Sequence, residues 1–265
     1  MTMLKGDVWE YRIQPSRIWG NLYFVGIRAV STHLIDTGAG LIIIDPGYSE
    51  SLQMIVENIR ELGFQPKDIK YIVVSHAHFD HMDSVAALVE MTGAKTFIGK
   101  GDLPLLTGEI YHYPLRSFVP DVLLEDGDII SLGNTRIRCV STPGHTDGTM
   151  SFFFDVTDGE RTYRAGMFGG AGRNTLLKEF LNERKLPFDC RQKMIDSIHK
   201  IKNEKVEIFL GNHLENNRTE EKLQALKTAE TNPFIGNSQK EWTDFLDARL
   251  EAVRRMIDTE DHQRR

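Results

Sequence analysis

Three histidines and an aspartate lie within six consecutive residues, at His76, His78, Asp80 and His81. They follow Tyr71-Ile72-Val73-Val74, an apolar and β-branched run that is typical of a buried strand. Neutral imidazole nitrogens combined with a carboxylate oxygen suit zinc and similar divalent metals. A strand that ends in this motif therefore brings several metal ligands to one point at the edge of a sheet.

The spacing within the motif separates its residues into two pairs. His76 and His78 are two residues apart, so on an extended segment their side chains face the same way and can bind one metal. Asp80 and His81 then turn toward a neighbouring position. A catalytic metal needs converging ligands and one position left open, so each pair still needs a third protein ligand.

Two later motifs offer the missing ligands. His145 follows Pro143-Gly144, a turn that can aim a side chain back at a sheet edge. His213 follows an apolar run, 206–210, just before a loop, which repeats the geometry of the first motif. The three motifs together predict a two-metal hydrolytic site. The remaining histidines considered lack convergent partners and are interpreted as ordinary residues: His33, His112, His199 and His262.

Composition excludes several other classes of protein. The chain has 265 residues, of which 40% are hydrophobic, so a sizeable core is available. Its formal net charge of −6 argues against nucleic-acid binding, which needs a basic patch. No apolar run is long enough to cross a bilayer, and the first ten residues lack the apolar core of a secretory signal. We therefore expect a cytoplasmic protein that acts on a small-molecule substrate, with Cys139 buried in a strand and no disulfide to Cys190.

The elements that position these motifs follow from hydrophobic periodicity and turn residues. Predicted strands span 22–25, 33–36, 41–44, 71–75, 95–98, 122–124, 129–132, 135–140, 150–154, 161–165 and 206–210. Predicted helices span 49–62, 190–203 and 239–258, and a further helix runs from a cap at Asp83 to Gly93. The segment 100–121, which contains Tyr111-His112-Tyr113, is predicted to be a long loop beside the site. The lack of a linker predicts one domain over residues 1–265, with two sheets packed face to face and helices outside.

The histidine motifs resemble those of the metallo-β-lactamase superfamily, and the resemblance covers most of the chain. It implies an αββα sandwich of two mixed β-sheets with helices on both outer faces. It also implies that each chain binds two zinc ions, the first held by His76, His78 and His145 and the second by Asp80, His81 and His213. Within Ile43-Ile44-Asp45-Pro46-Gly47, Asp45 is implied to orient one of these ligands.

The resemblance implies a hydrolase in which a metal-bridged hydroxide attacks a carbonyl, as in a β-lactam or a related amide or ester. Asp80 would be the catalytic residue, because it would bind the second metal and orient the hydroxide. The first metal would stabilise the oxyanion and the second would stabilise the leaving nitrogen or oxygen.

Departures from the family pattern bear on the substrate. Many of its hydrolases, including glyoxalase II and the lactonases, have a metal-bridging aspartate where this chain has Ala165-Gly166-Met167. A thioether cannot bridge two hard cations, so the chain is most similar to the β-lactamase subclass with an Asp-His-His second metal site. The segment Asn232-Pro233-Phe234-Ile235 is similar to the end of that subclass. The segments Met82-Asp83-Ser84 and Thr146-Asp147-Gly148 depart from it and leave the lactam substrate open.

Other functions remain open on the same motifs. A lactone, thioester or phosphodiester would suit the same hydrolytic chemistry. Iron or manganese are alternative metals, and an iron-dependent oxidoreductase of the same fold, such as a persulfide dioxygenase or a flavo-diiron protein, is an alternative enzyme. A metal-binding protein without catalysis is a third class. The sequence leaves the oligomeric state open.

Overall fold

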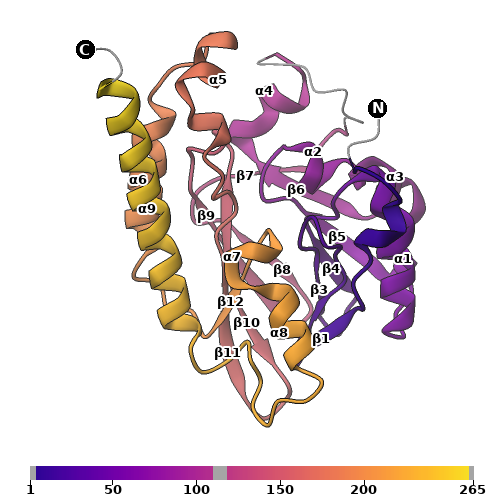
Figure 1. Cartoon of the computed structure of the whole chain (residues 1–265). Helices are drawn as coiled ribbons and strands as arrows, with labels where there is room; N and C mark the ends of the chain where they lie inside the picture. The colour runs from indigo at the N-terminus through magenta and orange to yellow at the C-terminus, as the bar shows by residue number, and fades with distance from the viewer. Residues whose placement is uncertain (1–3, 110–117, 263–265) are drawn as a thin grey trace.

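The computed structural model describes residues 4–109 and 118–262 of the chain, which form two mixed sheets with helices outside (Figure 1). The predicted αββα sandwich is confirmed. The aromatic cluster predicted at Tyr111-His112-Tyr113 lies outside the described residues. No helix in the described ranges has the length and apolarity that crossing a membrane requires.

The first sheet contains the strand that carries the histidine motif. Its neighbours run in sequence order from β1 to β7, antiparallel from β1 to β4 and parallel from β4 to β7. The strands are β1 (Ser16–Trp19), β2 (Leu22–Phe24), β3 (His33–Asp36), β4 (Leu41–Ile44), β5 (Ile69–Val73), β6 (Lys95–Gly99) and β7 (Val122–Leu124). Because β4, β5 and β6 are parallel, the loops that follow them leave the sheet at the same edge.

The second sheet carries the other two motifs. Its order is β12-β11-β10-β9-β8, in which only the β11–β12 pair is parallel among the described strands. The strands are β8 (Ile129–Leu132), β9 (Thr135–Ser141), β10 (Met150–Thr157), β11 (Thr162–Met167) and β12 (Ile208–Leu210). His145 lies between β9 and β10, and His213 lies just after β12.

Alternation along the strands places one set of apolar side chains between the sheets and another under the helices. On β10, Phe152 and Phe154 belong to the core between the sheets, whereas Phe153 faces the helices. Met167, at the place of the family's bridging aspartate, is fully buried in the core between the sheets. Cys139 is also buried there, as predicted, and forms no disulfide.

Helices cover both outer faces of the sandwich (Figure 1). Helices α1 (Leu52–Glu61) and α3 (Val85–Thr92) pack on the first sheet, and α6 (Cys190–Ile201) and α9 (Ser238–His262) pack on the second. The shorter helices are α2 (Phe79–Met82), α4 (Leu103–Leu106), α5 (Lys178–Glu183), α7 (Leu214–Asn217) and α8 (Thr219–Ala225). The 3-10 turns are η1 (Val8–Tyr11), η2 (Ser49–Ser51), η3 (Pro66–Asp68), η4 (Lys100–Asp102) and η5 (Asn174–Leu176).

The structure corrects some local predictions. Asp83 does not cap α3, because Ser84 directly precedes this helix and the Asp83 carboxylate accepts a hydrogen bond from the Ser49 N–H at 3.2 Å. The predicted long loop begins instead with η4 and α4, where Pro104 occupies the first turn of the helix, a position at which proline is favoured. Strand β1 and helices α2, α5, α7 and α8 were not predicted, because segments of four to seven residues are too short to establish a period.

Candidate metal centre

The six side chains predicted to form the site come together where the two sheets meet at one edge. His76 and His78 lie in the loop that follows β5, and Asp80 and His81 lie on the short helix α2. These four, with His145 and His213 from the second sheet, fall into two groups of three that match the predicted grouping. Their role as metal ligands stays a prediction.

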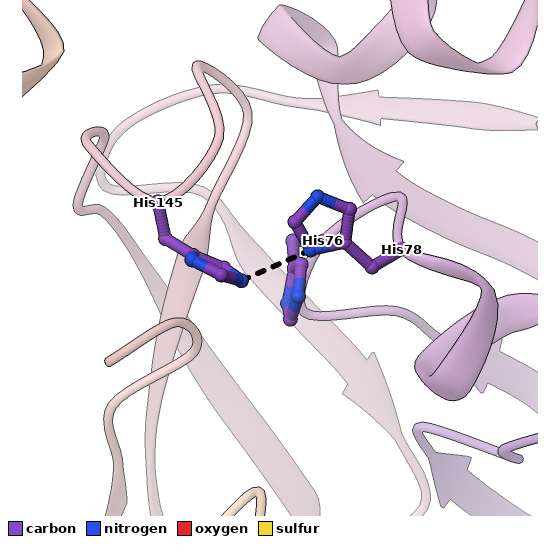
Figure 2. Close-up of side chains that lie close together, drawn as sticks. All are labelled: His76, His78 and His145. Atoms are coloured by element: carbon purple, nitrogen blue, oxygen red, sulfur yellow. Dashed lines mark hydrogen bonds between the residues drawn. The ribbon is translucent and has the colours of Figure 1, made fainter. Parts of the chain in front are cut away.

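The first group contains His76, His78 and His145 (Figure 2). All three are buried, and Nδ1 of His78 lies 2.9 Å from Nε2 of His145. Nε2 of His76 is buried without a hydrogen-bond partner among the described residues. A buried nitrogen of this kind is unfavourable unless something binds it, and a divalent cation between the three rings would satisfy it.

The second group contains Asp80, His81 and His213, whose donor atoms form a nearly equilateral triangle. Nε2 of His81 lies 3.2 Å from Nε2 of His213 and 3.4 Å from Oδ2 of Asp80, which lies 3.5 Å from Nε2 of His213. A tetrahedral zinc with bonds of about 2.0–2.1 Å requires its ligand atoms to lie roughly 3.3–3.4 Å apart. The observed spacing fits such an ion. The two groups adjoin, because the ring centroids of His76 and His81 are 4.2 Å apart.

In two of the predicted ligands, the ring nitrogen that points away from the triad forms a hydrogen bond with a backbone carbonyl oxygen. The carbonyl of Gly172 lies 3.0 Å from Nδ1 of His145, and the carbonyl of Ala29 lies 3.2 Å from Nδ1 of His213. A carbonyl can only accept, so each Nδ1 donates and each Nε2 keeps its lone pair. This arrangement fixes ring orientation and tautomer as metal-ligating histidines require.

Asp45 performs the same task for His81. Its Oδ2 lies 2.9 Å from Nδ1 of His81 and accepts the Ser75 hydroxyl at 2.6 Å, while its Oδ1 accepts the Ser75 N–H at 2.7 Å. Asp45 is fully buried and has a φ of 53°, in the left-handed region where aspartate is tolerated better than most residues. The predicted contact of Asp45 with a ligand of the site is therefore present.

Comparison with known proteins identifies the family. The model of the metallo-β-lactamase superfamily matches residues 25–158, which is half of the chain. The chain belongs to this superfamily. It is a metal-dependent hydrolase, as its relatives and structural neighbours are.

Similar proteins share both sequence and fold with this member of the superfamily. The probable polyketide biosynthesis zinc-dependent hydrolase PksB of Bacillus subtilis is 29% identical over 73% of this chain and 74% of its own. The FEZ-1 metallo-β-lactamase of Legionella gormanii superposes with a TM-score of 0.87 at 26% identity, over 95% of this chain and 98% of its own. The class B3 di-zinc metallo-β-lactamase LRA-12, from an Alaskan soil metagenome, gives a TM-score of 0.84 at 26% identity over 96% and 98% of the two chains.

Burial keeps the first group of this superfamily member neutral. Removal from water lowers the pKa of His76 and His145 well below the usual value and that of His78 to about 4, and nearby histidines add to the effect. At neutral pH all three rings are therefore uncharged. A neutral imidazole is the form that binds a metal.

The second group is charged in the metal-free protein. Burial alone would lower the pKa of His81, but the carboxylates of Asp80 and Asp45 outweigh it and raise this pKa to about 10. Burial alone would raise the pKa of Asp80, but His81 and His213 outweigh it and hold this pKa well below its usual range. The Asp80 carboxylate is thus ionised and ready to bind a cation, and a metal that binds here displaces a proton from His81.

Asp102 was not predicted, yet it joins the two loops that form the first group. It is fully buried, and its Oδ2 accepts the Ala77 N–H at 2.7 Å and the Thr146 hydroxyl at 2.9 Å. Its Oδ1 accepts the Gly148 N–H at 2.7 Å. Burial raises the pKa of Asp102 to about 6, although these three donors oppose the shift. Ala77 lies between His76 and His78, so the carboxylate ties their loop to the loop of His145.

Asp102→Asn is expected to loosen this connection. An amide offers one acceptor oxygen, so its NH₂ group must face at least one of the three donors. Leaving a buried donor unpaired costs about 1–3 kcal/mol, and we expect a loss of this size in the unfolding free energy of the metal-free protein, measured in urea. Glu125→Gln is the control, because Glu125 is exposed and pairs only with Lys100 among the described cations. An unchanged urea midpoint for Asp102→Asn would contradict this role.

A cleft of about 250 Å³ opens over both groups. His78, Asp80, His145 and His213 line it. Other polar residues also line it: Asn174, Asn212, Glu215, Asn216 and Arg249. Three other histidines of the described residues belong to neither group: His33, His199 and His262. His112 lies outside the described residues.

Proposed function

We propose that the chain is a zinc-dependent hydrolase that cleaves a carbonyl compound, a β-lactam or a related amide or ester. The observation that carries the proposal is the pair of adjoining donor triads at the base of one open cleft. The printed names of similar proteins support zinc, since one is a zinc-dependent hydrolase and another is a di-zinc β-lactamase. The class B3 fold neighbours support a β-lactam as the first substrate to test.

The residues divide between the two metals as the donor geometry suggests. His76, His78 and His145 would hold the first zinc ion, and the second triad, Asp80, His81 and His213, would hold the other. When bound, two zinc ions would supply a water molecule acidic enough to act as hydroxide near neutral pH, together with positive charge for the developing oxyanion.

The protein's own groups prepare this chemistry. The neutral rings of the first triad present lone pairs, and Asp45 turns Nε2 of His81 toward the second triad. The Asp80 carboxylate, 16% exposed, reaches the cleft with its charge intact and can accept a hydrogen bond from the nucleophile. Asp80 would thus orient the nucleophile as well as bind the second metal. No serine or cysteine nucleophile is required.

A second candidate substrate is a lactone or thioester. It is favoured by the match to PksB, a relative that is named as a hydrolase of polyketide biosynthesis and not as a lactamase. The same two triads would serve a β-lactam, a lactone or a thioester. In each case the nucleophile attacks a carbonyl carbon, and only the leaving group differs.

The purified full-length chain is expected to contain about two zinc ions and to lose turnover when a chelator removes them, because both triads are needed to hold the metals. Elemental analysis gives the metal content. Assays with nitrocefin, a lactone, a thioester and bis-p-nitrophenyl phosphate then identify the substrate class, before and after treatment with dipicolinate. Restoration of turnover by zinc supports the proposal. Iron near one per chain would favour an oxidoreductase, and a preparation that binds no metal would refute both enzymes.

A further inference from the structure

A single guanidinium faces the cleft that contains the metal triads. Arg249, from α9, lines it together with Asp80, His145 and His213. Among the described residues that line this cleft, Arg249 is the only lysine or arginine. In a chain with a net charge of −6, a fixed positive charge at this place requires an explanation.

The Arg249 side chain is held in position without being neutralised. Its guanidinium carbon lies 4.9 Å from the centre of the Phe245 ring, one helical turn earlier, and a guanidinium nitrogen donates a long hydrogen bond of 3.5 Å to Oδ1 of Asn216. Within residues 4–109 and 118–262, no carboxylate oxygen lies within 4.0 Å of this guanidinium. By contrast, Arg255 on the same helix is exposed and pairs with Glu251.

Among the described residues, the positive charge of Arg249 is compensated only in part, because Glu215 attracts it without forming an ion pair. Partial burial lowers the pKa of Arg249, Glu215 opposes this shift, and Arg173 adds to it less strongly than Glu215 opposes it. Glu215 lines the same cleft as Arg249 but is exposed to solvent, which screens its attraction for the guanidinium. A half-buried guanidinium that makes one hydrogen bond and no ion pair within the described residues can still offer N–H donors to an anion.

We propose that Arg249 determines specificity by receiving a carboxylate of the substrate, so that the natural substrate is an anionic carbonyl compound. The planar guanidinium can bind a carboxylate through two parallel hydrogen bonds, which fixes orientation as well as charge. The proposal rests on the proposed function, because it takes this cleft as the catalytic one. It goes beyond that function by assigning the charge of the substrate and the residue that recognises it.

The first test compares two substrates that differ by one charge. If β-lactams are turned over, the two substrates are nitrocefin and its methyl ester. If they are not, the two substrates are the acid and the methyl ester of the active lactone or thioester. For Arg249→Met, which keeps the unbranched stem over Phe245, we expect the KM of the acid to rise about tenfold or more. The kcat of both compounds and the KM of the ester should change less than threefold, and Arg249→Lys should be intermediate. Equal losses on both compounds would indicate a structural role and overturn the proposal.

The second test does not depend on turnover. Calorimetric titration of the zinc-loaded protein compares succinate with monomethyl succinate, since each has one carboxylate for the metals and only succinate has a second one. We expect the wild type to prefer succinate about tenfold or more, and Arg249→Met to lose this preference. The control Arg255→Met, on the same helix and away from the cleft, should keep it.

The two tests separate the two claims. If no substrate is turned over but the wild type prefers succinate and Arg249→Met does not, the proposed hydrolysis fails and the assignment of Arg249 stands. If turnover is found but wild type and Arg249→Met bind the two probes alike, the hydrolase stands and the assignment of Arg249 is wrong.

Discussion

His76→Ala is expected to lose the first zinc ion and to reduce turnover to background. The substitution removes one of three donors, and the loss of even an outer partner of a metal ligand typically costs 10–100-fold in affinity. We therefore expect the affinity of the first site to fall by more than about a hundredfold. Elemental analysis after dialysis and a competitive zinc titration measure this directly, beside the rate on the active substrate.

The structure predicts that this variant still folds. Nε2 of His76 has no hydrogen-bond partner in the described protein, and Nδ1 lies 3.1 Å from the Ser75 hydroxyl. That hydroxyl keeps its hydrogen bond to Asp45 when the ring is removed. Circular dichroism should be unchanged. His199→Ala is the matched control, because His199 is exposed on α6 and belongs to neither triad, and it should keep both zinc and rate. A His76→Ala protein that retained two zinc ions and full turnover would refute the assignment of the first site.

The grouping of the six side chains into two triads could be predicted because the information is local or carried by short motifs. His76, His78, Asp80 and His81 fall within one loop and one turn of helix, and a buried strand before them fixes where they lie. The strands of the sandwich could be predicted for the same reason, since alternating apolar runs bounded by glycine and asparagine identify strands without knowledge of their partners.

Asp102 and Arg249 could not be predicted, because their roles depend on contacts that sequence periodicity does not encode. The donors to Asp102 lie 25 to 46 residues away along the chain. A signal for Asp102 was nevertheless present. Asp102 follows β6, and because β6 is parallel to β5, the loop after β6 lies at the same edge of the sheet as His76. For Arg249, the amphipathic pattern of α9 separates its buried face from its polar one, but it does not say which polar residue faces a cleft.

Asp45 was predicted in part. The family resemblance implied that it orients a metal ligand, and the structure shows that the side chain it contacts is His81. In Asp45→Asn, the amide oxygen can keep the hydrogen bond from the Ser75 N–H. The NH₂ group then occupies the place of Oδ2 and faces Nδ1 of His81 and the Ser75 hydroxyl. His81 would then be held with its proton on Nε2, the atom that faces Asp80 and His213. Asparagine tolerates the positive φ at this position, so the backbone should not change.

We therefore expect Asp45→Asn to weaken zinc binding at the second site by about 10–100-fold, while the first site keeps its affinity. A competitive titration that resolves two binding steps measures both constants, and turnover should fall with occupancy of the second site and recover in part when zinc is raised. Asp36→Asn is the control, because Asp36 also accepts a backbone N–H, from Gly38, but lies away from the triads. If both binding steps weakened equally, Asp45 would be supporting the fold of the whole centre, and its specific action through the tautomer of His81 would be excluded.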